Sequence, residues 1–239
     1  MGGSWSASAL GADHASVLRA DAIRANLAAL ETRIAAACAR ASRERSAVTL
    51  VAVTKTFPAT DVEHAIAAGM TDVGENKVQE TRDKKPLVSA AARWHLIGHL
   101  QSNKAKDAVR LYDVIQTVDS IELAEKLARA AEAAGKTQDV LLQVNVGGEA
   151  QKSGVDPGAV AELAKKVSRL PSIRLAGLMT IPPLGDPEAM RPYFRELARM
   201  RHDLGLEELS MGMTDDFEVA IEEGATIVRV GRAIFGARG

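Results

Sequence analysis

The chain has 239 residues, of which 46% are hydrophobic and 26% charged, and this composition excludes disordered, collagen-like and coiled-coil proteins. Its 30 Lys and Arg residues almost balance 31 Asp and Glu residues, so no long-range positive field favours nucleic acid or an anionic membrane as a partner. No apolar stretch approaches the ~20 residues of a membrane-spanning helix, and the single Cys38 cannot form an internal disulfide. We therefore expect a cytoplasmic protein.

The chain is expected to begin with a flexible tail over residues 1–12 and to form one domain over residues 13–239. The tail is small and polar apart from Trp5. After it, apolar residues recur at the steps of one helix face, at Ile23, Leu27, Leu30, Ile34 and Cys38. This spacing predicts a long amphipathic helix that ends near Arg40.

From residue 48 onward, short apolar stretches alternate with helical patterns. Strands are expected at 48–54, 71–73, 94–97, 113–116, 140–145, 175–179, 208–210 and 226–230. Helices are expected around 62–66 and at 121–134, 158–170, 187–204 and 216–223. Eight strand-helix units in a chain of about 250 residues are typical of an α/β protein with a single (β/α)8 TIM barrel, here with an extra long N-terminal helix. A doubly wound open sheet is the alternative, but its usual glycine-rich motif does not follow the first strand.

Binding sites of such barrels lie at the carboxyl ends of the strands, where Lys55 directly follows the apolar stretch 48–54. A lysine there loses hydration, which lowers its pKa and frees the amine to attack a carbonyl group. Most lysines just past a strand are solvated, so the position of Lys55 alone is weak evidence for a Schiff base. Lys77 is the alternative amine, but it belongs to the first turn of a helix, and we favour Lys55.

The last two predicted strands end in small residues, at 210–214 and 229–232. In these barrels the loops after the seventh and eighth strands commonly bind phosphate through backbone amides. We expect the Ser210 hydroxyl and the amides of Gly212, Gly231 and Arg232 to serve such an anion. The structural alternative is that Thr214 or Asp215 caps the following helix and that Gly231 only permits a turn.

Arg229 lies between two valines in an apolar strand, so its guanidinium requires either an acidic partner or a ligand. If the ligand contains a pyridine ring, a guanidinium directed at the ring nitrogen would keep that nitrogen unprotonated. Asn76 and His95 are candidate ring contacts, although single polar residues of this kind are more often structural.

The histidines and Cys38 lack metal-ligand spacing, which argues against a zinc site. The charged stretches at 82–85 and 191–201 indicate solvated helix faces.

Taken together, these segments resemble the pyridoxal phosphate homeostasis proteins of the YggS/PROSC family, whose fold is an alanine racemase-like barrel preceded by a long helix. The resemblance runs in order from residue 50 to residue 236. It rests on Thr54-Lys55-Thr56-Phe57-Pro58, on Ser210-Met211-Gly212-Met213, and on the stretches 74–80, 94–104, 177–179, 216–218 and 228–236.

The resemblance implies that Lys55 carries pyridoxal 5'-phosphate as a Schiff base and that Arg229 faces its pyridine nitrogen. The residues around the phosphate would be Ser210, Gly212, Gly231 and Arg232, and those near the ring or phosphate Asn76, His95 and Met211. It further implies a carrier or regulator in vitamin B6 homeostasis, with apo-enzymes that depend on pyridoxal phosphate as partners. We expect this carrier to be a monomer or to associate weakly.

A low-activity pyridoxal phosphate-dependent amino-acid racemase is the alternative function. Racemases of this barrel class use a second base, a tyrosine from a C-terminal β domain. The chain ends at Gly239, shortly after Gly231, and Tyr112 and Tyr193 are poor substitutes, so we expect a non-catalytic protein. An unprotonated ring nitrogen also makes the cofactor a poorer electron sink. A phosphate-sugar isomerase or aldolase and a pure protein-interaction module are further alternatives that the motifs favour less.

Overall fold

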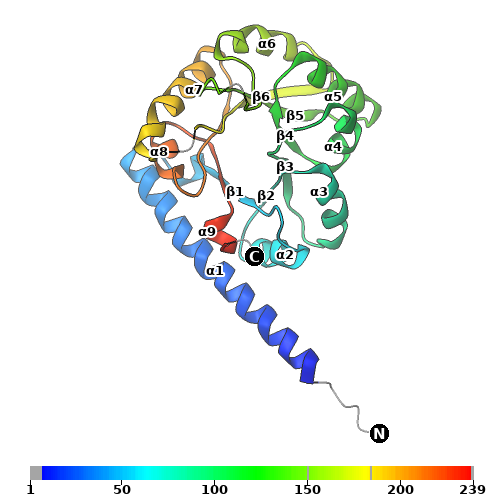
Figure 1. Ribbon diagram of the computed structural model, residues 1–239, viewed down its shortest axis with the longest axis vertical. Coiled ribbons are helices and arrows are strands. Elements are labelled where there is room, and N and C mark those ends of the chain that lie inside the picture. The colour runs from blue at the N-terminus through cyan, green and yellow to red at the C-terminus, as the bar shows by residue number, and fades with distance from the viewer. Residues whose placement is uncertain (1–6, 150, 184, 238–239) are drawn as a thin grey trace.

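A computed structural model describes residues 7–149, 151–183 and 185–237 of the protein. Eight parallel strands form a closed barrel in chain order, and β8 pairs with β1 (Figure 1). The strands are β1 Thr49–Val53, β2 Asp72–Glu75, β3 Arg93–Leu96, β4 Val114–Val118, β5 Gln138–Gln143, β6 Ile173–Met179, β7 Glu208–Ser210 and β8 Ile227–Val230. Each overlaps a strand expected from the sequence, so the predicted (β/α)8 TIM barrel is confirmed.

Helices surround the barrel (Figure 1). They are α1 Ala7–Arg40, α2 Ala59–Ala67, α3 Val78–Lys84, α4 Ala105–Leu111, α5 Ile121–Ala133, α6 Val160–Val167, α7 Arg191–Asp203, α8 Phe217–Glu222 and α9 Arg232–Phe235. Short 3-10 helices occur at Arg45–Ala47, Lys85–Leu87, Ser102–Lys104, Pro157–Ala159 and Glu188–Met190. The sequence did not predict α4 and α9, because helices of 7 and 4 residues are too short to show apolar periodicity.

Helix α1 is longer than the sequence predicted. It begins at Ala7, so residues 7–12 of the expected tail are helical, and residues 1–6, including Trp5, lie outside the described residues. The alanines of this segment favour helix and no proline interrupts it. The first part of α1 extends beyond the barrel, while its second half packs beside α8 and α9 (Figure 1). None of the helices in the described ranges combines the length and apolar character needed to span a membrane.

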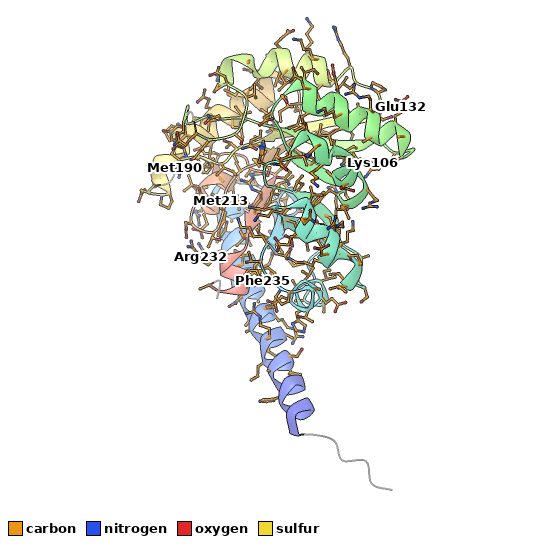
Figure 2. All side chains as sticks on the ribbon, turned by 45° about the vertical axis from the view of Figure 1, so that its right-hand side comes forward. Lys106, Glu132, Met190, Met213, Arg232 and Phe235 are labelled. Carbon is orange, nitrogen blue, oxygen red and sulfur yellow. The ribbon has the colours of Figure 1, made fainter. Side chains whose placement is uncertain are left out.

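Strand residues alternate between the barrel interior and the outer core, as a closed sheet requires. The alternation is interrupted in β6, where the register shifts at Ala176, so that Ala176 and Met179 both belong to the interior cluster. In β8, Ile227 belongs to the interior apolar cluster, whereas Val228 and Val230 pack in the outer core against the helices. The interior cluster consists of Val51, Val114, Leu141, Ala176, Met179 and Ile227. Side chains fill the body of the molecule (Figure 2), so the barrel is a packed core with its binding surface at one end.

The buried face of α1 makes it part of the core and gives a first prediction. Ile34 is fully buried against the barrel helices, and Ile34→Ala is expected to lower the free energy of unfolding by about 2–5 kcal/mol because it leaves a cavity. Val17→Ala is the matched control, because Val17 on the same helix is 57% exposed and should change stability by less than about 0.5 kcal/mol. Equal effects in urea unfolding would show that α1 does not contribute to the core.

Candidate functional site

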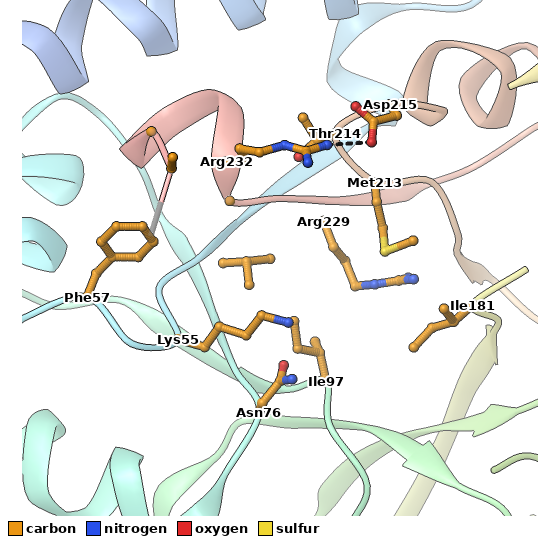
Figure 3. Close-up of a pocket in the computed structure, with 14 residues that line it drawn as sticks. Lys55, Phe57, Asn76, Ile97, Ile181, Met213, Thr214, Asp215, Arg229 and Arg232 are labelled. Atoms are coloured by element: carbon orange, nitrogen blue, oxygen red, sulfur yellow. Dashed lines mark hydrogen bonds and ion pairs between the residues drawn. The ribbon is translucent and has the colours of Figure 1, made fainter. Parts of the chain in front are cut away.

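A cavity opens at the carboxyl ends of the strands, and we call it the barrel-mouth cavity. Its volume of about 420 Å³ lies within the range of about 300–1,000 Å³ that small-ligand pockets occupy. Its polar and charged lining residues are Lys55, Asn76, Thr214, Asp215, Arg229 and Arg232. Its apolar walls come from Val53, Phe57, Ile97, Ile181 and Met213 (Figure 3).

Barrel closure brings the two ends of the predicted site together. Lys55 follows β1 and Arg229 lies in β8, and these strands pair in parallel with Val51 beside Arg229. Figure 3 shows the Lys55 and Arg229 side chains reaching into the same space, with Asn76 next to Lys55. Of the nine residues expected at the site, Lys55, Asn76, Arg229, Gly231 and Arg232 line the cavity.

The glycine at position 231 allows the ends of β8 and β1 to approach closely. A Cβ atom on Gly231 would lie 2.9 Å from the Val53 carbonyl oxygen and 3.2 Å from its Cβ. Any larger residue therefore pushes the end of β8 away from β1. The glycine is required by this contact as well as by any ligand that approaches the backbone.

Ser210 and His95 are buried in the barrel interior behind Arg229. The Arg229 Nη1 donates to Ser210 Oγ over 2.6 Å, and Ser210 Oγ donates to Gln116 Oε1 over 2.6 Å. The amide of Gln116 then faces His95 Nδ1 at 2.9 Å, and His95 Nε2 lies 2.8 Å from Asp72 Oδ1. We call these five residues the interior chain.

The hydrogen bonds of the interior chain all run in one direction. Because Gln116 Oε1 accepts from Ser210, its Nε2 donates to His95 Nδ1, and the ring proton therefore sits on Nε2 and is donated to Asp72. Burial of the Asp72 carboxyl disfavours its ionisation, but the hydrogen bonds from His95 and Thr71, together with nearby positive charge such as that of Arg93, lower its pKa. His95 and Ser210 are not among the described residues that line the cavity, and they are connected to it only by the hydrogen bonds that lead to Arg229. Their direct contacts with a ligand stay predictions.

Met211 and Gly212 also lie away from the cavity lining. Met211 is fully buried in the outer core, because it follows Ser210 by one position and therefore faces the helices. Gly212 has a φ of +92°, and a Cβ there would lie 2.6 Å from Ala220 Cβ. This glycine turns the chain so that Met213, Thr214 and Asp215 reach the cavity. The contacts expected of Met211 and Gly212 with a ligand stay predictions.

Arg229 is the electrostatic centre of the site. It is 3% exposed, and the bonds that hold it go to two neutral acceptors, Ser210 Oγ and the Thr180 carbonyl oxygen at 2.8 Å. Burial lowers its pKa to about 10, against an opposing effect of the Asp216 charge, so it remains a cation at neutral pH. A buried cation with neutral partners is costly, and a ligand that accepts a hydrogen bond would compensate it.

The sequence predicted a contribution from the 210–214 stretch through Ser210 and Gly212, but it indicated neither the apolar walls nor Met213, Thr214 and Asp215 as lining residues. Ile97 lies directly after β3 and two positions after His95, so continued alternation would have placed it on the same side of the sheet as His95. Asp215 forms an ion pair with Arg232 at 2.5 Å, and both side chains are mostly exposed at the rim (Figure 3). Among the residues that the structure describes, no group of three His, Cys, Asp or Glu side chains could hold a metal ion.

Removal of one bond in the interior chain should destabilise the protein. Ser210→Ala deprives Arg229 and Gln116 of a buried partner, and we expect it to lower the free energy of unfolding by about 1–3 kcal/mol. Ser168→Ala is the control, because Ser168 is exposed on the barrel surface and should have an effect below about 0.5 kcal/mol. Urea unfolding measures both, and equal stability of the two variants would contradict the interior chain.

Curated relatives cover nearly the whole chain. The pyridoxal phosphate homeostasis protein of Aquifex aeolicus is 44% identical over 214 residues, which is 86% of this chain and 94% of the relative. The pyridoxal phosphate homeostasis protein of Pseudomonas aeruginosa is also 44% identical, over 90% of this chain and 96% of its own length. The protein of that name in Escherichia coli K12 is 40% identical over 89% and 95% of the two chains.

Solved structures agree with this assignment. PipY of Synechococcus elongatus, solved with PLP bound, has a TM-score of 0.80 and 37% identity over 90% of this chain and 100% of its own. Alanine racemase of Clostridium difficile, at 14% identity and a TM-score of 0.70 over 91% of this chain and 57% of its own, shares the fold. The family model for the alanine racemase N-terminal domain matches residues 20–239. The chain therefore belongs to the pyridoxal phosphate homeostasis protein family, which is built on the alanine racemase N-terminal barrel.

Proposed function

We propose that the barrel-mouth cavity binds pyridoxal 5'-phosphate and that the protein serves vitamin B6 homeostasis as a non-catalytic carrier. The observation that carries the proposal is the meeting of Lys55 and Arg229 in one cavity of about 420 Å³. The names of the relatives and the ligand of the PipY structure support the choice of ligand. The ligand supplies an aldehyde, which a lysine amine can bind covalently and reversibly.

The residues of the cavity fit each part of this ligand. Lys55 Nζ would form a Schiff base with the aldehyde carbon, and the aldehyde oxygen would leave as water. Arg229, a buried cation without a charged hydrogen-bond partner among the described residues, would donate to the pyridine nitrogen. Ile97 and Met213 offer apolar surface to a planar ring, and Arg232 with the backbone at Gly231 offers positive charge and amides to the phosphate.

A carrier is favoured over a racemase by what surrounds Lys55. Tyr112 is buried outside the barrel, where it hydrogen bonds Thr81 and burial raises its pKa. Tyr193 lies on α7 in contact with the outer core. Neither tyrosine is among the described residues that line the cavity, so neither is placed to act as a second base. A guanidinium beside the ring nitrogen also keeps that nitrogen unprotonated, which weakens the ring as an electron sink.

The proposal also covers the transfer of the ligand, the compartment and the oligomeric state of the protein. A Schiff base shields the aldehyde from other amines and exchanges with an incoming amine, which suits transfer to apo-enzymes in the cytoplasm. We include in the proposal that the protein does this as a monomer. Solvent deuterium incorporated at Cα of alanine at catalytic rates would instead favour the racemase.

The reactive amine is tested by two lysine variants. Lys55→Ala should abolish the visible absorption band that forms when the protein is incubated with pyridoxal 5'-phosphate, because no amine remains at the cavity centre. Lys77→Ala should keep the band, since Lys77 is exposed and is not among the described lining residues. Borohydride reduction and peptide mapping should place the label on Lys55. A band of wild-type strength in Lys55→Ala would contradict the proposal.

The phosphate end is tested by charge at position 231. Gly231→Asp and Gly231→Asn place the same atoms near Val53, but only aspartate adds a negative charge where the phosphate is expected. We expect Gly231→Asp to weaken ligand binding by about tenfold or more relative to Gly231→Asn, because like charges a few ångströms apart repel. Spectrophotometric titration gives both dissociation constants, and equal values would place the phosphate elsewhere.

A further inference from the structure

The backbone beside Lys55 adopts a conformation that its own sequence does not favour. Residues 54–57 form a turn closed by the Phe57 amide, which donates to the Thr54 carbonyl oxygen at 3.1 Å. Thr56 in this turn has a φ of +69°, a region that β-branched residues rarely occupy. Such a conformation persists only where the surrounding structure holds it. Something outside the turn must therefore fix the residues on either side of Lys55.

Two side chains of α3 hold this turn. Lys84 Nζ donates to the Thr54 carbonyl oxygen at 2.8 Å, directly before Lys55. Glu80 Oε1 accepts from the Thr56 amide at 2.5 Å, directly after Lys55. Lys84 Nζ also contacts Glu80 Oε1 at 3.0 Å, so the two contacts belong to one unit that brackets Lys55.

A third residue anchors this unit to the barrel. Lys84 Nζ donates to Glu75 Oε1 at 2.6 Å, and Glu75 Oε1 also accepts from Thr54 Oγ1 at 2.7 Å. Glu75 ends β2 and its side chain is fully buried, while that of Lys84 is 8% exposed. All three donors of the Lys84 ammonium are thus engaged. We call Glu75, Glu80 and Lys84 the Lys84 cluster.

The Lys84 cluster is expensive to bury, and fold stability alone does not account for it. The charged stretch at 82–85 indicated a solvated helix face, yet the side chain of Lys84, the last residue of α3, is buried against the barrel. Two carboxylates face one ammonium, Glu75 Oε2 has no hydrogen-bond partner, and burial raises the pKa of Glu75. Apolar side chains of similar volume commonly stabilise such a position equally well. What apolar side chains lack is the ability to fix the Thr54 carbonyl and the Thr56 amide.

We propose that the Lys84 cluster is a positioning device that holds the 54–57 turn so that the Lys55 amine is directed into the barrel-mouth cavity. None of its three members is among the described residues that line the cavity, so they act through the backbone. The inference rests on the proposed function, in which Lys55 is the reactive amine. It adds that the reactivity of Lys55 is set by residues of α3 and β2 that never touch the ligand.

The test compares Lys84→Met with Lys85→Met. Lys85 is the matched control, because it is the neighbouring lysine, is partly buried and donates to the Leu111 carbonyl oxygen at 2.5 Å instead of to the turn. Two readouts are used: amide hydrogen exchange at Thr56 in the ligand-free protein, and the rate at which pyridoxal 5'-phosphate with borohydride labels Lys55. Labelling of the exposed Lys77 in the same sample serves as the internal standard.

We expect Lys84→Met to speed exchange at Thr56 and to slow labelling of Lys55, each by about tenfold or more, the effect of losing one charged hydrogen bond. Lys85→Met should stay within about twofold of the wild type in both readouts. Wild-type values of both in a folded Lys84→Met protein would overturn the proposal. Failure of Lys55 to label in the wild type would instead overturn the proposed function, while exchange at Thr56 would still report on the cluster.

A second pair of variants keeps the test decisive should Lys84→Met fail to fold. Glu80 is 25% exposed and tolerates change more readily. Glu80→Gln keeps an acceptor for the Thr56 amide, whereas Glu80→Ala removes it. We expect faster Thr56 exchange and slower Lys55 labelling in Glu80→Ala, and recovery of both in Glu80→Gln. Identical exchange in Glu80→Ala and the wild type would overturn the proposal.

Discussion

The pairing of β1 with β8 is the contact on which the candidate site depends. It joins the first strand of the barrel to the last, and so places Lys55 beside the end of a strand that starts 172 positions later, at Ile227. The pairing requires a glycine at position 231, because a side chain there would meet the Val53 carbonyl oxygen at 2.9 Å. Closure of the sheet and assembly of the site are therefore one event.

Two buried cations near the carboxyl end of β1, Arg229 and Lys84, have different kinds of hydrogen-bond partners. Arg229 faces the cavity and hydrogen bonds only neutral acceptors, so its positive charge is available to interact with a ligand. The Lys84 ammonium donates its three hydrogen bonds to the carboxylates of Glu75 and Glu80 and to the backbone of the turn beside Lys55. One cation is open toward a ligand and the other is closed within the protein. The contrast separates a residue that binds from a residue that shapes the binding site.

Much of the fold could be predicted from the sequence, because barrel strands covered on both faces read as short apolar runs such as 48–54. Position at the end of a strand indicated that Lys55 and Gly231 would meet, and the family resemblance added Asn76 and Arg229 to the same site. Met211 was harder, because its side of the strand depends on strict alternation from Ser210. Lys84 could not be predicted, since a charged helix face looks solvated until α3 is placed against the barrel.

The interior chain has a consequence for the field inside the barrel. It begins at the Arg229 guanidinium and ends at Asp72, the first residue of β2, whose hydrogen bonds favour the ionised carboxylate. The dipoles of Ser210, Gln116 and His95 point the same way between these opposite charges. Each donated hydrogen points toward Asp72, so the row presents its negative ends to the Arg229 guanidinium and its positive ends to the carboxylate, and it stabilises both charges. The aligned row thus holds a cation at the mouth of the barrel, and the attraction for an anionic guest comes from that guanidinium, in a medium that screens its charge far less than water does.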